Sequence, residues 1–498
     1  MQPAGILHDD RGWAATAAVT AVAAALRLPG LGRPATLVFD ETYYVKDAWT
    51  LLQLGYEAEW GADPNAAFEA GDTSGFGTDA SYVVHPAVGK WLIALGLRLL
   101  GAGDPAGWRI ASALAGVLAV LLLTRIARRL LGSTVLGAVA GLLLAVDGLA
   151  IVHSRTALLD GFLMVLVLAA FGALLVDRDR SRARLARATA PPRATTTWGP
   201  WLGWRPWRLA AGVLLGLALG TKWSALWFVA VLGLLTVGWD LAARYAAGVR
   251  RPWTGTLARD AWPAFLSLVP VAALTYLATW ASWFASPDAY HRQWAVQHPG
   301  QGVTWLPPAL RSLWHYHQEM WGFHTSLTAE HGYAAHPVGW LVQWRPTSFF
   351  YETPEPARDL CGADRCSQAV TSLGNPLLWW LGTAAVVACV WWVVRRRDGV
   401  AVAALSGLVA GWLPWFAYAH RTIFTFYAIV VLPWLILALV HAADRFVGHG
   451  PRAGTRRTVA LMAFALVIAT SVFFYPVWTA QVIPFRTWQL HQWLPSWV

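Results

Sequence analysis

Two adjacent carboxylates, Asp40 and Glu41, stand just beyond the first apolar segment of the chain, after a turn-prone stretch rich in proline and glycine. An ionisable group at a membrane boundary is costly unless it is paired or has a function. A carboxylate held there can take a proton from a hydroxyl nucleophile or orient a bound substrate. The structural alternative is a helix start, because Asp and Glu are stabilised at the positive end of the helix dipole.

Further polar side chains occur beside other predicted membrane boundaries. The cations among them are Lys90, Arg155, Lys222 and Arg421, and the other candidates are His85, Glu319, His324 and Tyr427. Carboxylates beside several cations suit a reaction whose substrate carries both a hydroxyl and a lipid phosphate. For each cation the alternative is a side chain that extends to the lipid headgroups while its stem lies in the membrane.

Metal-binding side chains gather in one later stretch, at His315, His317, Glu319 and His324. Their spacing matches no compact zinc motif. Because the cations near the carboxylate pair already supply positive charge for a phosphate, we expect a site that needs no metal and no other cofactor.

The composition indicates the class of protein that must position these residues. Of the 498 residues, 57% are hydrophobic and only 13% are charged, whereas soluble domains carry about 25% charged residues. The sequence therefore predicts a multispanning membrane protein, in which most of the 33 tryptophans anchor the helices at the two membrane interfaces. The net charge of +11 falls mainly in connections on one side, which indicates membrane orientation and not a nucleic-acid partner.

The apolar runs predict about eleven membrane spans in a single integral-membrane unit, residues 1–498. The expected spans cover residues 13–29, 108–131, 134–152, 157–176, 209–220, 225–237, 262–284, 376–394, 400–418, 424–440 and 459–478. The connection 177–208 is the richest in arginine, so we assign it to the cytoplasmic side. This topology predicts a cytoplasmic N-terminus, an outer C-terminus, and a first apolar segment that spans the membrane instead of serving as a cleaved signal peptide.

Two long loops then share the outer face with the carboxylate pair: residues 30–107 and residues 285–375. In the first loop we expect short helices along the membrane at residues 45–49 and 89–101, and a flexible polar segment at residues 61–81.

The second loop contains two of the three cysteines, Cys361 and Cys366. A local disulfide between them is expected if this loop lies outside the cytoplasm, where oxidising conditions preserve such bonds.

Several stretches resemble the protein O-mannosyltransferases, a family with the type C glycosyltransferase fold. They occur in the family's order over nearly the whole chain: FDETYYVKDAW, HPAVGKW, SRTALLDGFLM, GTKWSALW, LWHYHQEMWGFHTSL, HPVGWLVQWRP with SFFYE, and GNPLLWW. One departure is HPAVGKW, where the family more often has a second proline. The resemblance implies an all-α polytopic membrane protein. Because the second loop is too short for the lumenal β-trefoil domain of eukaryotic members, the chain is similar to bacterial members.

Enzymes of this family transfer mannose from a polyprenyl monophosphate, with inversion, to a Ser or Thr hydroxyl of a protein at the outer face. The resemblance therefore implies a polyprenyl phosphate mannose donor, a secreted or membrane protein as acceptor, and a location in the plasma membrane. The bilayer is a partner in any case, and the protein translocation machinery is a further candidate partner.

The carboxylate pair supplies the chemistry in this interpretation. We predict Asp40 as the general base for the acceptor hydroxyl and Glu41 as the group that orients donor or acceptor, with the reverse assignment open. Other type C enzymes can use a divalent ion held by acids, so a cation bound by this pair is the alternative to a metal-free site.

The cations would hold the leaving polyprenyl phosphate. The resemblance implies this role for Arg155 and Lys222, and the topology adds Lys90 and Arg421. Glu319 and the remaining candidates, His85, His324 and Tyr427, are assigned to acceptor binding or to packing of the loops.

Two other function classes compete with this prediction. One is a related polyprenyl-phosphate-sugar glycosyltransferase that modifies a lipid or a glycan. The other is a transporter or lipid flippase, which would place charges near the middle of its spans. Here the charges cluster at one face, and no inverted repeat is evident, so the transporter is the weaker alternative.

Overall fold

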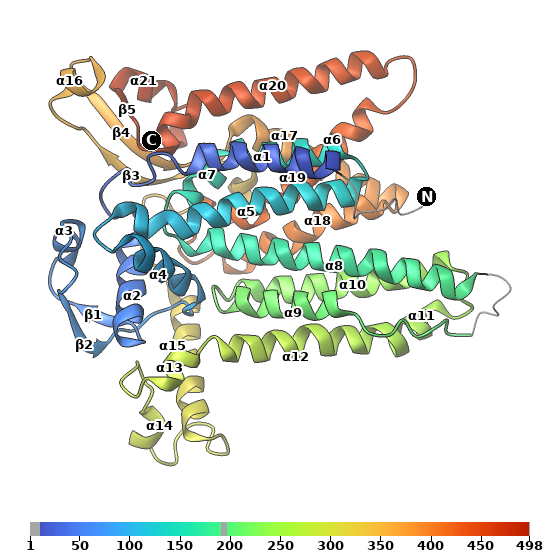
Figure 1. Cartoon of the computed structure of the whole chain (residues 1–498), viewed down its shortest axis with the longest axis horizontal. Coiled ribbons are helices and arrows are strands. Elements are labelled where there is room, and N and C mark those ends of the chain that lie inside the picture. The colour runs from blue at the N-terminus through green and yellow to red at the C-terminus, as the bar shows by residue number, and fades with distance from the viewer. Residues whose placement is uncertain (1–9, 191–196, 498) are drawn as a thin grey trace.

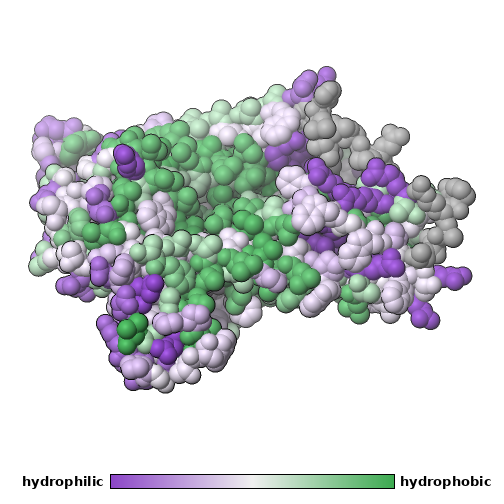
Figure 2. Space-filling view, turned by 60° about the horizontal axis from the view of Figure 1, so that its bottom comes forward, coloured by the Kyte–Doolittle hydropathy of each residue, from purple (hydrophilic) through white to green (hydrophobic). Residues whose placement is uncertain are grey.

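The computed structural model describes residues 10–190 and 197–497, and Figure 1 shows a bundle of long helices that run side by side. The first helix, α1 (Asp10–Arg27), packs against α5 (Pro105–Leu131) and α6 (Thr134–Val146). In lipid a backbone must satisfy its own hydrogen bonds, which explains why the apolar stretches form helices. Figure 2 shows an apolar band across the middle of the molecule, with hydrophilic residues toward both ends.

Eight helices of the described chain are long and apolar enough to cross a membrane, and a bent pair raises the number to nine. The eight are α5, α8 (Leu159–Thr189), α10 (Ala225–Ala246), α11 to α12 (Pro252–Ala278), α17 (Pro376–Arg396), α18 with η3 (Gly399–Tyr418), η4 with α19 (Thr425–Val447) and α20 (Ala453–Trp478). The bent pair joins α6 to α7 (Gly148–Ser154) at 63°. The multispanning class is confirmed. Because α1 and α9 (Pro206–Leu219) are shorter or less apolar, the count of eleven stays a prediction.

The first long loop folds at one end of the bundle. It forms α2 (Glu41–Leu54), β1 (Ala58–Trp60), α3 (Pro64–Glu69), β2 (Phe76–Ala80) and α4 (Val88–Leu100). In Figure 1, α2 lies across the ends of the long helices. The expected helix at residues 45–49 is part of α2, and α4 matches the expected short helix at 89–101.

The predicted flexibility of residues 61–81 is wrong, because β2 pairs antiparallel with β1. The Trp60 ring packs against Phe68 and Phe76, with both pairs of ring centroids 5.5 Å apart. Phe68 is completely buried. Phe68 also contacts Trp108 of α5, with ring centroids 5.9 Å apart, so the aromatic rings fasten the polar loop to the end of the bundle.

The second long loop lies at the same end of the bundle (Figure 1). It forms α13 (Ala281–Ala285), α14 (Trp294–Gln297), α15 (Pro308–Ser326), η2 (Pro337–Val342), β3 (Thr347–Glu352), α16 (Ala357–Cys361) and β4 (Cys366–Ser372). The last segment of the chain adds β5 (Val482–Pro484), α21 (Phe485–Leu490) and η5 (Pro495–Trp497), so the sheet order is β3-β4-β5. A disulfide joins Cys361 to Cys366, as expected for this loop.

Buried ion pairs occupy part of the arginine-rich end opposite α2. Arg205 contacts Asp240 at 2.7 Å and Asp177 at 3.0 Å. Arg244 donates to Asp260 at 3.0 Å. Buried charges are tolerated when each is paired and hydrogen-bonded, so these arginines tie α8, α10 and η1 (Leu257–Ala261) together there.

Candidate functional site

Asp40 stands directly before α2, and its neighbour Phe39 fixes where it lies. Phe39 has a φ of 50°, a left-handed conformation that is rare outside glycine. Its ring stacks on Phe349 of β3 with centroids 4.7 Å apart and meets Phe426 of η4 edge-on at 5.5 Å. A strained residue persists only where its surroundings hold it, so these rings position the Asp40 backbone.

The Asp40 carboxyl is half-buried among charged and polar groups. Burial is the largest effect and raises its pKa to about 6. The Lys222 ammonium and a hydrogen bond with Tyr44 lower this pKa by smaller amounts, and the Asp160 carboxylate raises it. A carboxylate whose pKa lies close to the working pH is suited to accept and release a proton. The raised pKa is therefore compatible with the role predicted for Asp40.

Glu41 is completely buried and faces a different set of groups. Its two oxygens accept from Arg109 Nε at 2.8 Å and Nη2 at 2.7 Å. They also accept from the backbone N–H of Val38 at 3.0 Å and of Ala157 at 2.7 Å. With four donors on two oxygens, Glu41 holds the start of α2 against α5 and the segment before α8.

Lys222 lies in the turn between α9 and α10 and is paired with Asp160 at the start of α8. Its Nζ donates to the two Asp160 oxygens at 3.0 and 2.9 Å. It also lies 4.8 Å from the ring centroid of Tyr427, a cation–π distance. Both members of the ion pair are almost fully buried, with 8% of Lys222 and 4% of Asp160 exposed.

A cavity of about 630 Å³ opens beside this ion pair. Its polar lining includes Lys222, Arg421 and Tyr427. Its apolar walls come from α9, α10, α12 and η3 (Leu413–Tyr418), and they include Leu219, Leu226, Trp227, Ala273 and Trp415. A space with cations at one place and apolar side chains along the walls suits a lipid-linked phosphate.

Two stacked histidines, His85 and His324, line the same cavity. Their ring centroids are 5.1 Å apart, and His324 Nε2 donates to the Val84 carbonyl at 2.7 Å. Burial lowers the pKa of His324 to about 4 and that of His85 well below its ordinary value. Both rings are therefore neutral at physiological pH and add shape and hydrogen-bonding groups to the wall, without charge.

Lys90 is directed away from this cavity. It is 1% exposed and pairs with Glu57 and, at 3.6 Å, with Asp47. The helix that carries it packs closely on α8, because a Cβ at Gly89 would lie only 2.6 Å from the Leu159 side chain. Lys90 thus joins α4 to α2 and to the segment before β1.

Arg155 also does not line the cavity, and its guanidinium binds backbone carbonyls at the end of α1. Its Nη1 donates to the carbonyls of Arg27 at 2.7 Å and Pro29 at 2.9 Å, and its Nη2 donates to Gly30 at 2.5 Å. The side chain is 3% exposed. This guanidinium caps the end of α1 and fixes the turn that leads toward Asp40.

Glu319 lies on α15 with its carboxylate turned to other histidines. Its Oε1 is 3.0 Å from His291 Nε2 and 3.4 Å from His315 Nε2. The other two histidines of the predicted set turn elsewhere: His317 Nε2 meets the Tyr276 hydroxyl at 2.6 Å, and His324 contacts Val84. The structure therefore brings Glu319 together with His315 and with His291, which the sequence analysis did not consider, and not with His317 or His324.

Of the residues predicted from the sequence, Lys222, Arg421, Tyr427 and the histidine pair line one cavity. Asp40 is not among the lining residues, but it lies close enough to interact electrostatically with Lys222 and Tyr427. The sequence analysis missed two residues. Arg109 is the ion partner of Glu41, and His291 is the histidine nearest to Glu319. Arg109 carried a usable signal, because an arginine just inside an apolar span requires a partner.

Comparison with solved structures shows that this chain shares its fold with a protein O-mannosyltransferase and, more distantly, with ArnT. The protein O-mannosyltransferase Pmt1-Pmt2 complex of S. cerevisiae bound to the sugar donor matches with a TM-score of 0.74 at 16% identity, over 98% of this chain and 93% of that chain. ArnT from Cupriavidus metallidurans bound to undecaprenyl phosphate matches with a TM-score of 0.50 at 20% identity, over 94% of this chain and 65% of that chain.

The chain belongs to the protein O-mannosyltransferase family. Residues 79–250 match the family model for dolichyl-phosphate-mannose-protein mannosyltransferase, and residues 309–497 match that for the C-terminal four-helix region of protein O-mannosyltransferase. A polyprenol-phosphate-mannose–protein mannosyltransferase of Mycobacterium tuberculosis is 41% identical over 99% of this chain and 93% of its own length. A protein of the same name from Corynebacterium glutamicum is 35% identical over 98% of this chain and 94% of its own length.

Proposed function

We propose that this chain transfers mannose from a polyprenyl phosphate to the hydroxyl of a Ser or Thr residue in a secreted or membrane protein. The observation that carries the proposal is a cavity with apolar walls that Lys222 and Arg421 line. The half-buried Asp40, whose pKa is raised to about 6, lies close enough to interact with the Lys222 ammonium. Family membership favours a protein acceptor over a lipid or glycan acceptor and over transport. The direct test is mannosyl transfer by the purified chain from polyprenyl phosphomannose to a Ser/Thr-rich peptide; no transfer to the peptide would contradict the proposal.

The reaction needs one proton transfer and one displacement. Asp40 takes the proton of the acceptor hydroxyl while the hydroxyl oxygen forms a bond to C1 of the mannose. The bond between C1 and the phosphate oxygen breaks on the opposite side, which inverts the configuration at C1. The polyprenyl phosphate leaves with the bonding electrons.

Lys222 and Arg421 are the cations that would stabilise this leaving phosphate. Both line the cavity, and a planar guanidinium can meet two phosphate oxygens at once. Because Lys222, although paired with Asp160, and Arg421 can both donate to the phosphate, the proposal includes no divalent ion at Asp40. Transfer by the folded enzyme should therefore continue after exposure to a strong chelator, and complete, magnesium-reversible loss of transfer would contradict this.

Arg421→Ala should weaken donor binding by about 10- to 100-fold, because a hydrogen bond to a charged group contributes roughly 1.5–3 kcal/mol. The measurement is the Kd of the purified protein for polyprenyl phosphomannose. Arg421 is a cleaner choice than Lys222, whose removal would leave Asp160 buried without its ion partner.

Arg155→Ala is the matched comparison, since its guanidinium is bound to three backbone carbonyls. This variant should be less stable yet bind donor within about twofold of the wild type in its folded fraction. If instead Arg155→Ala raised the donor Kd as much as Arg421→Ala, the phosphate would be held at Arg155.

We also propose that the site faces outward across the plasma membrane, with the N-terminus in the cytoplasm. The support is the arginine bias of the connections at the end of the bundle opposite α2. A reporter enzyme that works only outside should be active when fused after Gly71 or Gly332 and silent after Ala190. Activity at Ala190 would reverse the orientation.

An outward site would receive acceptor chains as they leave the protein translocation machinery, before their Ser and Thr residues are buried. Cross-linking during secretion should then capture unfolded acceptor on the chain. Modification of folded acceptor at an equal rate would argue against this coupling.

A further inference from the structure

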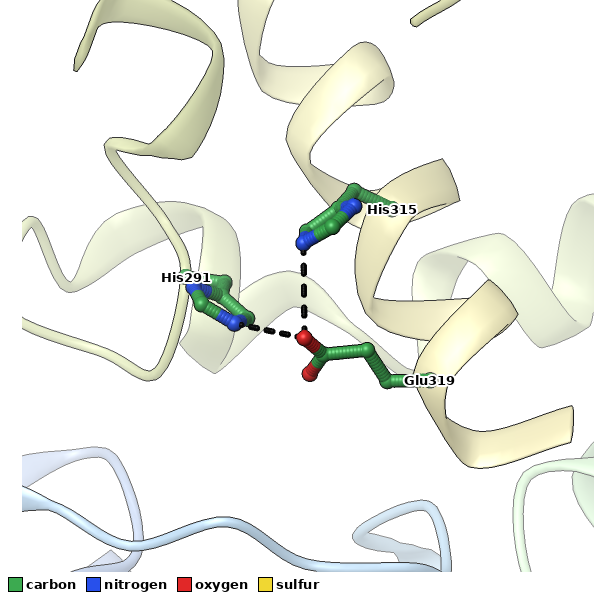
Figure 3. A group of neighbouring side chains, drawn as sticks. All are labelled: His291, His315 and Glu319. Carbon is green, nitrogen blue, oxygen red and sulfur yellow. Dashed lines mark hydrogen bonds and ion pairs between the residues drawn. The ribbon is translucent and has the colours of Figure 1, made fainter. Parts of the chain in front are cut away.

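A trio of metal-binding side chains lies in the second long loop. Figure 3 shows His315 and Glu319 on the same helix, α15, and His291 opposite them on the segment between α13 and α14. Residues four positions apart share one face of a helix, which explains why His315 and Glu319 point the same way. The trio is distinct from the cavity, because the α15 residues that line the cavity are His317, Trp321, His324 and Thr325.

The geometry of the trio is close to that of a metal site. One ligand atom from each residue lies within 4.8 Å of the other two. The distances of Glu319 Oε1 to the two Nε2 atoms are 3.0 Å for His291 and 3.4 Å for His315. Ligand atoms bound tetrahedrally at about 2.0–2.1 Å from a zinc ion lie roughly 3.4 Å apart. Only small side-chain movements would be needed to bind an ion.

The rings are held and the site is open to ions. His315 stacks on Trp294 with centroids 4.0 Å apart and planes 10° apart, which fixes the direction of its Nε2. His291 has a φ of 53° and packs on Tyr290 at 4.2 Å. The three side chains are 28%, 26% and 34% exposed in the order His291, His315 and Glu319, so an ion can reach them from solution.

Nearby positive charges are turned away from the trio. Arg292 donates to the Phe284 carbonyl at 3.1 Å and lies over the Trp283 ring. Arg311, one turn before His315 on α15, donates to the Ala295 carbonyl. Each arginine is thus bonded to a backbone carbonyl, and the Glu319 carboxylate supplies negative charge within the trio.

We propose that His291, His315 and Glu319 bind one divalent transition-metal ion of the zinc class. Two imidazole nitrogens and one carboxylate oxygen suit zinc, whereas magnesium and calcium prefer oxygen ligands throughout. The ion would fasten the segment between α13 and α14 to α15. Because the opposite face of α15 lines the cavity, metal binding would stiffen the cavity wall. This inference does not rest on the proposed function.

The test uses the full chain, purified in detergent with an affinity tag that lacks histidine and stripped of metal with a chelator. Zinc is titrated by calorimetry, and the midpoint of thermal unfolding is measured with and without zinc. We expect one zinc per chain and a higher unfolding midpoint on binding. Binding should weaken in acid, where protons compete with the ion for the imidazole nitrogens.

His315→Gln and Glu319→Gln should each weaken zinc binding by at least about tenfold, since even changes to groups that support metal ligands cost 10- to 100-fold. His298→Gln is the control, because His298 stacks on the same Trp294 ring but lies outside the trio. If either ligand variant fails to fold, His291→Asn serves instead.

Cobalt substitution reports the ligand environment without any activity measurement. Bound cobalt should give visible absorption bands in the wild type and in His298→Gln, and these bands should be lost in the ligand variants. Equal zinc affinity in wild type and all variants, an absence of stoichiometric zinc, or magnesium binding as tight as zinc binding would each overturn the proposal. Donor binding is measured on the same samples, so failure here is distinguishable from failure of the mannosyl-transfer proposal.

Discussion

Asp40→Asn should lower mannosyl transfer by about 10²- to 10⁴-fold, the usual contribution of a general base. Asparagine keeps the size of the side chain but cannot accept the proton of the acceptor hydroxyl. Donor binding should be retained or tightened, because the change removes a negative charge from the neighbourhood of Lys222. The measurements are turnover with a Ser/Thr-rich peptide and, separately, the Kd for polyprenyl phosphomannose.

Asp79→Asn is the matched control, since Asp79 is an exposed carboxylate in β2 of the same loop. It should leave turnover unchanged. Normal turnover in Asp40→Asn, with protein of equal stability, would remove Asp40 from the chemistry.

The pH profile supplies a second readout of the same residue. A base must be ionised to accept a proton, and burial raises the pKa of Asp40 to about 6. Transfer by the wild type should therefore decline as pH falls through about 6, instead of near the value of about 4 that is usual for aspartate. The residual activity of Asp40→Asn should lack this decline.

Glu41→Gln should reduce the free energy of unfolding by about 3–5 kcal/mol, the typical result of breaking a buried ion pair. A glutamine would turn a donor amide toward Arg109 or toward one of the two backbone N–H groups that the carboxylate now accepts. The Arg109 guanidinium would also lose its buried counter-charge. The measurements are the yield of folded protein and its unfolding in denaturant within detergent micelles.

Glu59→Gln, at an exposed position in β1, should leave stability within about 0.5 kcal/mol of the wild type. Transfer per folded molecule of Glu41→Gln then separates the two roles of this residue. A stable but inactive Glu41→Gln protein would show that Glu41 takes part in the reaction.

The span-forming helices were predictable because a long apolar run leaves the backbone few alternatives in lipid. The fold of the first loop was not, because it depends on Trp60 meeting Phe68 and Phe76 across a short hairpin. A polar stretch with few apolar residues looks flexible until those contacts are known.

The placement of Asp40, Lys222 and Arg421 at one end of the bundle was predictable, since the topology brings them there. The partners of Lys90 and Arg155 were not predictable, because they lie far away in the sequence. Lys90 pairs with an acid, and Arg155 donates to backbone carbonyl oxygens. His291 was overlooked for a related reason. Spacing templates compare neighbours along the chain, whereas His291 reaches Glu319 from another segment.

The packing of Phe39 has a consequence for how the enzyme matures in the cell. Ribosomes release the chain from its N-terminus, so Asp40 enters the membrane environment long before Phe349 and Phe426 have been synthesised. Until those rings arrive, the left-handed backbone at Phe39 lacks the stacked and edge-on contacts that they provide, while the Glu41–Arg109 pair and nearby backbone bonds hold the segment. A chain truncated before Phe349 would therefore lack both ring contacts beside Asp40, however well its first helices insert.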